Sequence, residues 1–132
     1  PGVTVVLDTN IYSAWRRGDP RVRSHVTQAN ALLLPVIVIG ELMFGFRNGS
    51  RYRRNLKDLE AFLANDRVTV LPVSLTTADR FGRIVAALRK AGTPIPTNDI
   101  WIAAHAYESG AELITFDGHF SAVSGLVCTH LA

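Results

Sequence analysis

The chain alternates short apolar runs with longer segments of helical pattern. Residues 3–7 form a run of mostly β-branched residues that stops at Asp8. Such a run, without polar residues in alternation, is typical of a strand that is buried on both faces of a parallel sheet. Further apolar runs follow at intervals, so we expect five strands, over residues 3–7, 31–35, 68–73, 111–116 and 126–130.

The segments between these runs carry helical periodicity and helix-boundary residues. Apolar residues recur at three- and four-residue steps opposite a group of arginines, which predicts an amphipathic helix; they are Leu56, Leu59, Phe62 and Leu63. We expect helices over residues 9–17, 20–29, 36–47 and 98–109, and two more, one after Ser50 and one ending before Gly92. The candidate N-caps of the last three helices in chain order are Ser50, Thr76 or Thr77, and Thr97.

This alternation predicts the fold class. Parallel strands are joined by long crossovers, usually helices, and these helices cover both faces of the sheet. We therefore expect an α/β protein with three layers, α/β/α, around a parallel sheet of about five strands. A chain of 132 residues is close to the size of one domain, so we expect residues 1–132 to form a single domain.

Composition limits the class of protein and the cellular location that we expect. Hydrophobic residues make up 48% of the chain and charged residues 19%, which argues against a disordered, collagen-like or coiled-coil protein. Cys128 is the single cysteine, so an internal disulfide and a cysteine-based zinc site are both excluded. No apolar run approaches the roughly 18 residues of a membrane span. We expect a cytoplasmic protein with no membrane partner.

Basic residues are clustered, and most of them are arginine. The formal net charge is +3, and 12 of the 14 cationic residues are arginines. The planar guanidinium group pairs with phosphate better than a lysine ammonium does. This charge mildly favours an anionic partner such as a nucleic acid, although arginine clusters are more often solvated faces or protein-contact surfaces. The candidate contact residues are Arg16, Arg17, Arg51, Arg53 and Arg54.

Four acids fall where predicted strands end or where the following helices begin. Asp8 ends the first strand and Asp117 the fourth, while Glu41 lies early in the helix after the second strand. Asp99 lies in the first turn of helix 98–109, and the extended segment 93–96, with its two prolines, returns the chain to that edge. Because the carboxyl ends of parallel strands share one edge of a sheet, we expect the four carboxylates to lie together.

Each acid also has a structural interpretation. Asp8 can cap a helix, Asp99 can stabilise a helix N-terminus, and Asp117 can form a turn. Glu41 fits such a role poorly because apolar residues flank it. Together, four carboxylates at short range repel one another unless cations lie between them. Oxygen ligands suit Mg²⁺ or Mn²⁺, and this pattern favours metal-assisted hydrolysis of phosphodiester bonds, with the arginines on the nucleic-acid backbone.

Four motifs occur in order along nearly the whole chain. They are Leu7-Asp8-Thr9-Asn10, Ile39-Gly40-Glu41-Leu42, Thr97-Asn98-Asp99-Ile100-Trp101-Ile102-Ala103-Ala104 and Leu113-Ile114-Thr115-Phe116-Asp117. The first alone is a weak signal, but the ordered set in matching strand and helix contexts is specific. With it, the chain resembles PIN-domain ribonucleases, and particularly the VapC-type toxins of bacterial toxin–antitoxin pairs.

The resemblance implies an endoribonuclease that depends on Mg²⁺ or Mn²⁺. The matches to catalytic and metal-binding positions are Asp8, Glu41, Asp99 and Asp117, and the matches to supporting polar positions are Asn10 and Thr115. The resemblance also implies an RNA substrate, a homodimer, and a VapB-like antitoxin that wraps around residues 52–63. Many relatives carry an asparagine-containing turn in the last motif, whereas this chain has Asp117-Gly118-His119. A phosphate contact by His119 is one interpretation, and a turn residue is the favoured one.

Two other functions remain open on the residues alone. One keeps the fold without catalysis, as an RNA- or antitoxin-binding module whose acids hold a structural ion. The other is a phosphotransfer domain with Asp8 as nucleophile, similar to haloacid-dehalogenase phosphatases. That function is ranked last, because Asp8-Thr9-Asn10 lacks the second aspartate of the motif and Lys57 and Lys90 are the only lysines.

Overall fold

The computed structural model describes residues 3–132, and its centre is a five-stranded parallel sheet with the order β3-β2-β1-β4-β5. Residues 1 and 2 of the predicted domain lie outside this range. The strands are β1 (Thr4–Leu7), β2 (Ala31–Pro35), β3 (Val68–Leu71), β4 (Glu112–Thr115) and β5 (Cys128–His130). The chain order reverses at β1, so the carboxyl ends of β1 and β4 lie side by side at the point where ligands bind in open α/β sheets.

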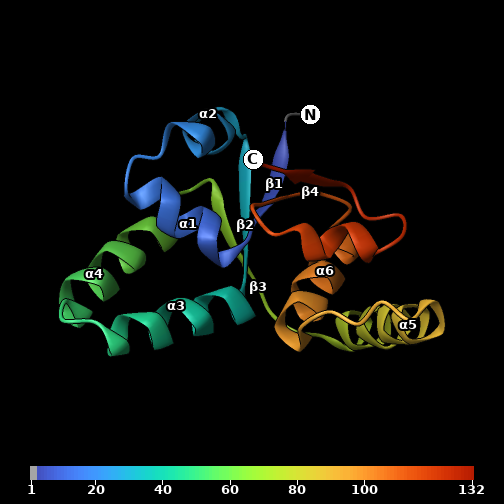
Figure 1. Ribbon diagram of the computed structural model, residues 1–132. Helices are drawn as coiled ribbons and strands as arrows, with labels where there is room; N and C mark the ends of the chain where they lie inside the picture. Colours follow the sequence, from blue (N-terminus) through green and yellow to red (C-terminus); the bar gives the residue numbers. More distant parts are fainter. Residues whose placement is uncertain (1–2) are drawn as a thin grey trace.

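Helices cover both faces of the sheet, as Figure 1 shows with the sheet seen nearly edge-on. One face carries α1 (Thr9–Arg16), α2 (Pro20–Gln28), α3 (Val36–Asn48) and α4 (Tyr52–Leu63); the other carries α5 (Leu75–Ala91) and α6 (Thr97–Ser109). A short 3₁₀ helix, η1 (Gly118–Ala122), follows β4. The predicted three-layer α/β/α architecture with about five parallel strands is confirmed. Over residues 3–132, every helix is too short or too polar to cross a bilayer.

Burial explains why the apolar runs form the inner strands. Val5, Val6 and Leu7 of β1 are at most 1% exposed, although successive side chains of a strand point to opposite faces of the sheet. Both faces of β1 are therefore covered. The edge strand β3 differs, since Val70 is 38% exposed.

The connection between α5 and α6 brings Asp99 to the edge where β1 ends. With 17 residues, α5 carries the chain about 25 Å along its axis. The segment after Gly92 runs back along α5, and Pro96 has the polyproline-like angles φ −57° and ψ 144° just before α6 begins. Phe81 of α5 and Trp101 of α6 stack with ring centroids 4.0 Å apart, which holds the two helices together.

Helix caps differ from the sequence prediction. Ser74, rather than Thr76 or Thr77, caps α5, and Thr77 completes a capping box by accepting from the Ser74 backbone N–H. No side chain caps α4 or α6, so the caps assigned to Ser50 and Thr97 are wrong. These helices are anchored through buried side chains instead, Leu59 in α4 and Ile102 in α6, which are both 0% exposed.

Candidate functional site

Asp8 lies where β1 ends and α1 begins, and it is 4% exposed. Its Oδ1 accepts the Thr9 backbone N–H at 2.6 Å, and its Oδ2 accepts the Thr115 hydroxyl at 2.6 Å. Burial raises the pKa of Asp8, the two hydrogen bonds lower it, and the charges of Glu41 and Asp117 raise it further. Asp8 is thus both the N-cap of α1 and a buried carboxylate under the influence of other acids.

Glu41 projects from the second turn of α3 and links three helices. Its Oε1 accepts the Thr9 hydroxyl of α1 at 2.6 Å, and its Oε2 accepts the Asn98 side-chain amide of α6 at 3.3 Å. The sequence places Glu41 among apolar residues, and these two donors explain how its carboxylate is accommodated.

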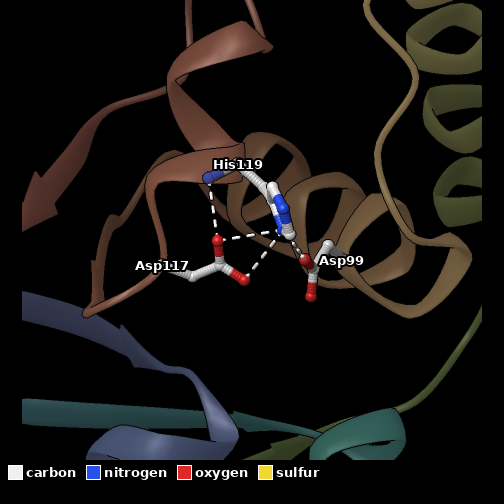
Figure 2. A group of neighbouring side chains, drawn as sticks. All are labelled: Asp99, Asp117 and His119. Atoms are coloured by element: carbon white, nitrogen blue, oxygen red, sulfur yellow. Dashed lines mark hydrogen bonds and ion pairs between the residues drawn. The ribbon is translucent and has the colours of Figure 1, made fainter.

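Asp99, Asp117 and His119 form a cluster in which one ligand atom from each residue lies within 4.8 Å of the others. Figure 2 shows the His119 ring between the two carboxylates. Its Nδ1 lies 3.1 Å from Oδ2 of Asp99 and 3.1 Å from Oδ2 of Asp117. The His119 backbone N–H donates to Oδ1 of Asp117 at 2.8 Å, and the Asp117 backbone N–H donates to the Thr115 hydroxyl at 2.9 Å.

The electrostatics of this cluster favour a bound cation. Burial raises the pKa of Asp99 to about 6, the hydrogen bond from His119 lowers it, and the charges of Asp117 and Asp8 raise it. The neighbouring Asp99 and Asp117 carboxylates raise the pKa of His119. Within residues 3–132, neither lysine nor arginine forms a salt bridge with any of the four acids. The charged partner of Asp99 and Asp117 among the described residues is His119, and one imidazolium cannot neutralise four carboxylates, so the group keeps a negative charge that a divalent ion would offset.

The structure brings all four predicted acids to one edge of the sheet, and it adds groups that the sequence analysis missed. Thr9 and Asn98 are partners of Glu41, and His119 is a partner of Asp99 and Asp117. Thr9 and Asn98 each stand next to a predicted acid, and His119 lies two positions after Asp117, so adjacency to the acids was the available signal.

Asn10 behaves differently from the other predicted supporting residue. Thr115 contacts both Asp8 and Asp117. Asn10 is exposed in the first turn of α1, and over residues 3–132 no hydrogen bond joins it to an acid of the site. A supporting role for Asn10 stays a prediction.

The candidate contact arginines lie at the C-terminal end of α1 and at the start of α4. Arg16 pairs with Asp58 at 3.1 Å and lies over the Trp15 ring. With Arg17, it lines a cavity of about 210 Å³ between α1, α3 and α4. The other three, which are exposed at the start of α4, are Arg51, Arg53 and Arg54.

Comparison with known proteins places this arrangement in a family. The PIN domain model matches residues 5–126. Ribonuclease VapC2 of Haemophilus influenzae is 36% identical over 112 residues, covering 83% of each chain. The tRNA(fMet)-specific endonuclease VapC of Shigella flexneri is 31% identical over 125 residues, covering 92% of each chain.

A solved structure gives the same result for the fold. The structure of VapBC-1 from nontypeable Haemophilus influenzae matches with a TM-score of 0.84 and 27% identity, over 97% of this chain and 98% of that chain. The sequence match and the shared fold both extend over most of the chain. This chain therefore belongs to the PIN-domain family and, within it, to the VapC ribonucleases.

Proposed function

We propose that this protein is a metal-dependent endoribonuclease that hydrolyses RNA phosphodiester bonds as the toxin of a VapBC-type toxin–antitoxin pair. Relatives named ribonuclease VapC and tRNA(fMet)-specific endonuclease VapC support the reaction class. The observation that carries the proposal is that four acids gather at the carboxyl ends of β1 and β4 and near the starts of α3 and α6. Asp99 and Asp117 lie close enough to share one divalent ion, and such an ion can assist phosphodiester hydrolysis.

The donor set fits Mg²⁺ or Mn²⁺. Asp8, Asp99 and Asp117 would hold the ion through carboxylate oxygens, which are the ligands that hard divalent ions prefer. When bound, a divalent ion would polarise a water for in-line attack and stabilise the charge on the leaving oxygen.

The remaining polar groups position these carboxylates. Glu41, oriented by Thr9 and Asn98, would accept a proton from the attacking water. Thr115 holds Asp8 through its hydroxyl and holds the Asp117 backbone through the same oxygen. One side chain thus sets the spacing between two of the proposed ligands.

The surface beyond the acids suits the proposed partners. Setting the four acids aside leaves seven acidic residues against 14 lysines and arginines, so the rest of the chain is distinctly basic. Exposed arginines at the start of α4 would contact RNA phosphates or a VapB-like antitoxin, and Phe44 of α3, 67% exposed, adds apolar area for the antitoxin. We also propose a homodimer, as the family resemblance implies, and a cytoplasmic location, which the single cysteine favours.

Cleavage of RNA by purified, antitoxin-free protein tests the proposal. Internal cleavage is expected with Mg²⁺ or Mn²⁺, and is expected to stop when EDTA is added. Asp8→Asn is expected to abolish cleavage, whereas Asp66→Asn, in the exposed turn between α4 and β3, is a matched control that keeps it. RNA binding without cleavage under all metal conditions would favour the non-catalytic module instead.

A further inference from the structure

Two distances from the His119 ring equal those between neighbouring ligands of one metal ion. Nδ1 of His119 lies 3.1 Å from Oδ2 of Asp99 and 3.0 Å from Oδ1 of Asp117. In an octahedral complex with metal–ligand distances of about 2.1 Å, adjacent ligand atoms lie about 3 Å apart. The nitrogen is therefore at the distance from both carboxylates that neighbouring ligands of one ion have.

The position of the His119 ring is built into the turn after β4. The Thr115 hydroxyl accepts the Asp117 backbone N–H, and Oδ1 of Asp117 accepts the His119 backbone N–H. Ser121 closes η1 by donating its hydroxyl to the Gly118 carbonyl at 2.8 Å. These bonds fix where the imidazole leaves the backbone, and Figure 2 shows the ring directed between the two carboxylates.

We infer that Nδ1 of His119 is itself a ligand of the divalent ion, together with Asp99 and Asp117, so that this site has a mixed nitrogen and oxygen donor set and prefers Mn²⁺ to Mg²⁺. The inference rests on the proposed function, because it concerns the ion of that same site. It gives the site a nitrogen ligand, which the four carboxylates cannot provide.

The metal preference follows from donor chemistry. Mg²⁺ takes oxygen ligands almost exclusively and holds its waters tightly, whereas imidazole nitrogen is a good ligand for first-row transition ions. Replacing one oxygen ligand by Nδ1 therefore favours Mn²⁺ relative to Mg²⁺. The side chain of His119 is 52% exposed, so solvent reaches the ring at its position between the two carboxylates.

Electron spin echo spectroscopy of bound Mn²⁺ tests the inference directly, with or without catalytic turnover. The wild-type protein is expected to show ¹⁴N modulation from a coordinated imidazole, and His119→Gln is expected to lose it. Calorimetric titration is expected to give Mn²⁺ affinity about tenfold or more lower in His119→Gln, with Mg²⁺ affinity changed by less than about threefold. His25→Gln, in α2 at the opposite edge of the sheet, is the matched control and is expected to change neither.

The outcomes separate this inference from the proposed function. Bound Mn²⁺ without ¹⁴N modulation in the wild type, or modulation that persists in His119→Gln, would overturn the ligand assignment while leaving the nuclease proposal standing. Tighter Mn²⁺ binding by His119→Gln would also overturn it, since His119 would then be a competing internal cation. A wild-type protein that binds neither ion and cleaves no RNA would remove the proposed function together with the inference.

Discussion

The Thr115 hydroxyl donates a 2.6 Å hydrogen bond to Oδ2 of Asp8, across 107 positions of the chain. The bond joins the carboxyl ends of β1 and β4, and both residues are buried. Because Thr115 also accepts the Asp117 backbone N–H, one hydroxyl orients two acids that lie at different ends of the sequence. The geometry of the site thus depends on the register between these two strands.

Replacing Thr115 by valine keeps the side-chain volume but removes the hydroxyl. Thr115→Val is expected to raise the pKa of Asp8 further, because the lost hydrogen bond lowers it, and to weaken Mn²⁺ binding about 10–100-fold. Thr115→Ser, which keeps the hydroxyl and loses a buried methyl worth about 1 kcal/mol, is expected to lose stability but keep the ion. Calorimetric Mn²⁺ titration of the two variants checks this, and equal affinities would show that the hydroxyl is unimportant.

The sheet edge was predictable, because apolar runs without polar alternation indicate strands buried on both faces, and parallel strands share one carboxyl edge. Strand order along the chain is therefore enough to predict that Asp8 and Asp117 lie together. It did not find His119, since the turn that directs its ring back toward Asp99 depends on hydrogen bonds to Thr115 and Asp117 that no periodicity encodes.

Helix caps were predicted less well than strands, again for a physical reason. Ser74, Thr76 and Thr77 are all good N-cap residue types, and the choice among them depends on where β3 ends. The capping-box residue Thr77 is also fully buried, and its hydroxyl donates to the carboxylate of Glu108 in α6 at 2.6 Å. This tertiary contact helps to set the start of α5.

Metal binding is expected to depend on pH through Asp99. Its pKa is raised from 3.8 to about 6, chiefly by burial, so the folded metal-free protein retains a proton there that the unfolded chain releases. The Asp99 contribution to the free energy of unfolding therefore falls as pH rises through this window. The ion needs the ionised carboxylate, so an Mn²⁺ concentration that saturates the site at about pH 7.5 should raise Tm by several degrees there and little at about pH 5.

Thermal unfolding in Mn²⁺ and in EDTA, at a series of pH values, measures this difference. Asp99→Asn is expected to lose most of the metal-induced shift at every pH, whereas Asp66→Asn keeps the wild-type profile. An equal Mn²⁺ shift at acid and neutral pH would contradict a ligand role for Asp99.

The arginines at the start of α4 are expected to bind partners without affecting the ion. The double change Arg53→Gln and Arg54→Gln removes two exposed charges, and each lost phosphate contact should lower the salt dependence of single-stranded RNA binding by about 0.7 in log–log slope. Binding of an unstructured single-stranded oligoribonucleotide at several salt concentrations, on an Asp8→Asn background that prevents cleavage, measures the slope. Mn²⁺ affinity should not change.

Arg16→Gln is the internal comparison. Because Arg16 is already paired with Asp58 at 3.1 Å, this substitution is expected to change the salt-dependence slope less than the double change does. If the double variant bound both RNA and antitoxin as the wild type does, the contact role of these arginines would be wrong. A loss confined to antitoxin binding would assign them to the protein interface.

His105 should make the protein less stable in acid. Its side chain is 1% exposed in α6, its Nε2 is a buried atom without a hydrogen-bond partner over the described residues 3–132, and burial lowers its pKa below the usual 6.5. As pH falls below about 6.5, the unfolded chain takes up a proton that the folded protein does not, so the free energy of unfolding decreases. His105→Leu removes this group. Urea unfolding at about pH 5.5 and about pH 7.5 should then show a smaller decrease in the free energy of unfolding at the lower pH than in the wild type. The contributions of all other titratable groups are the same in both proteins and cancel in this comparison. An identical decrease in the free energy of unfolding in the variant would show that His105 is protonated in the folded state as readily as in the unfolded chain.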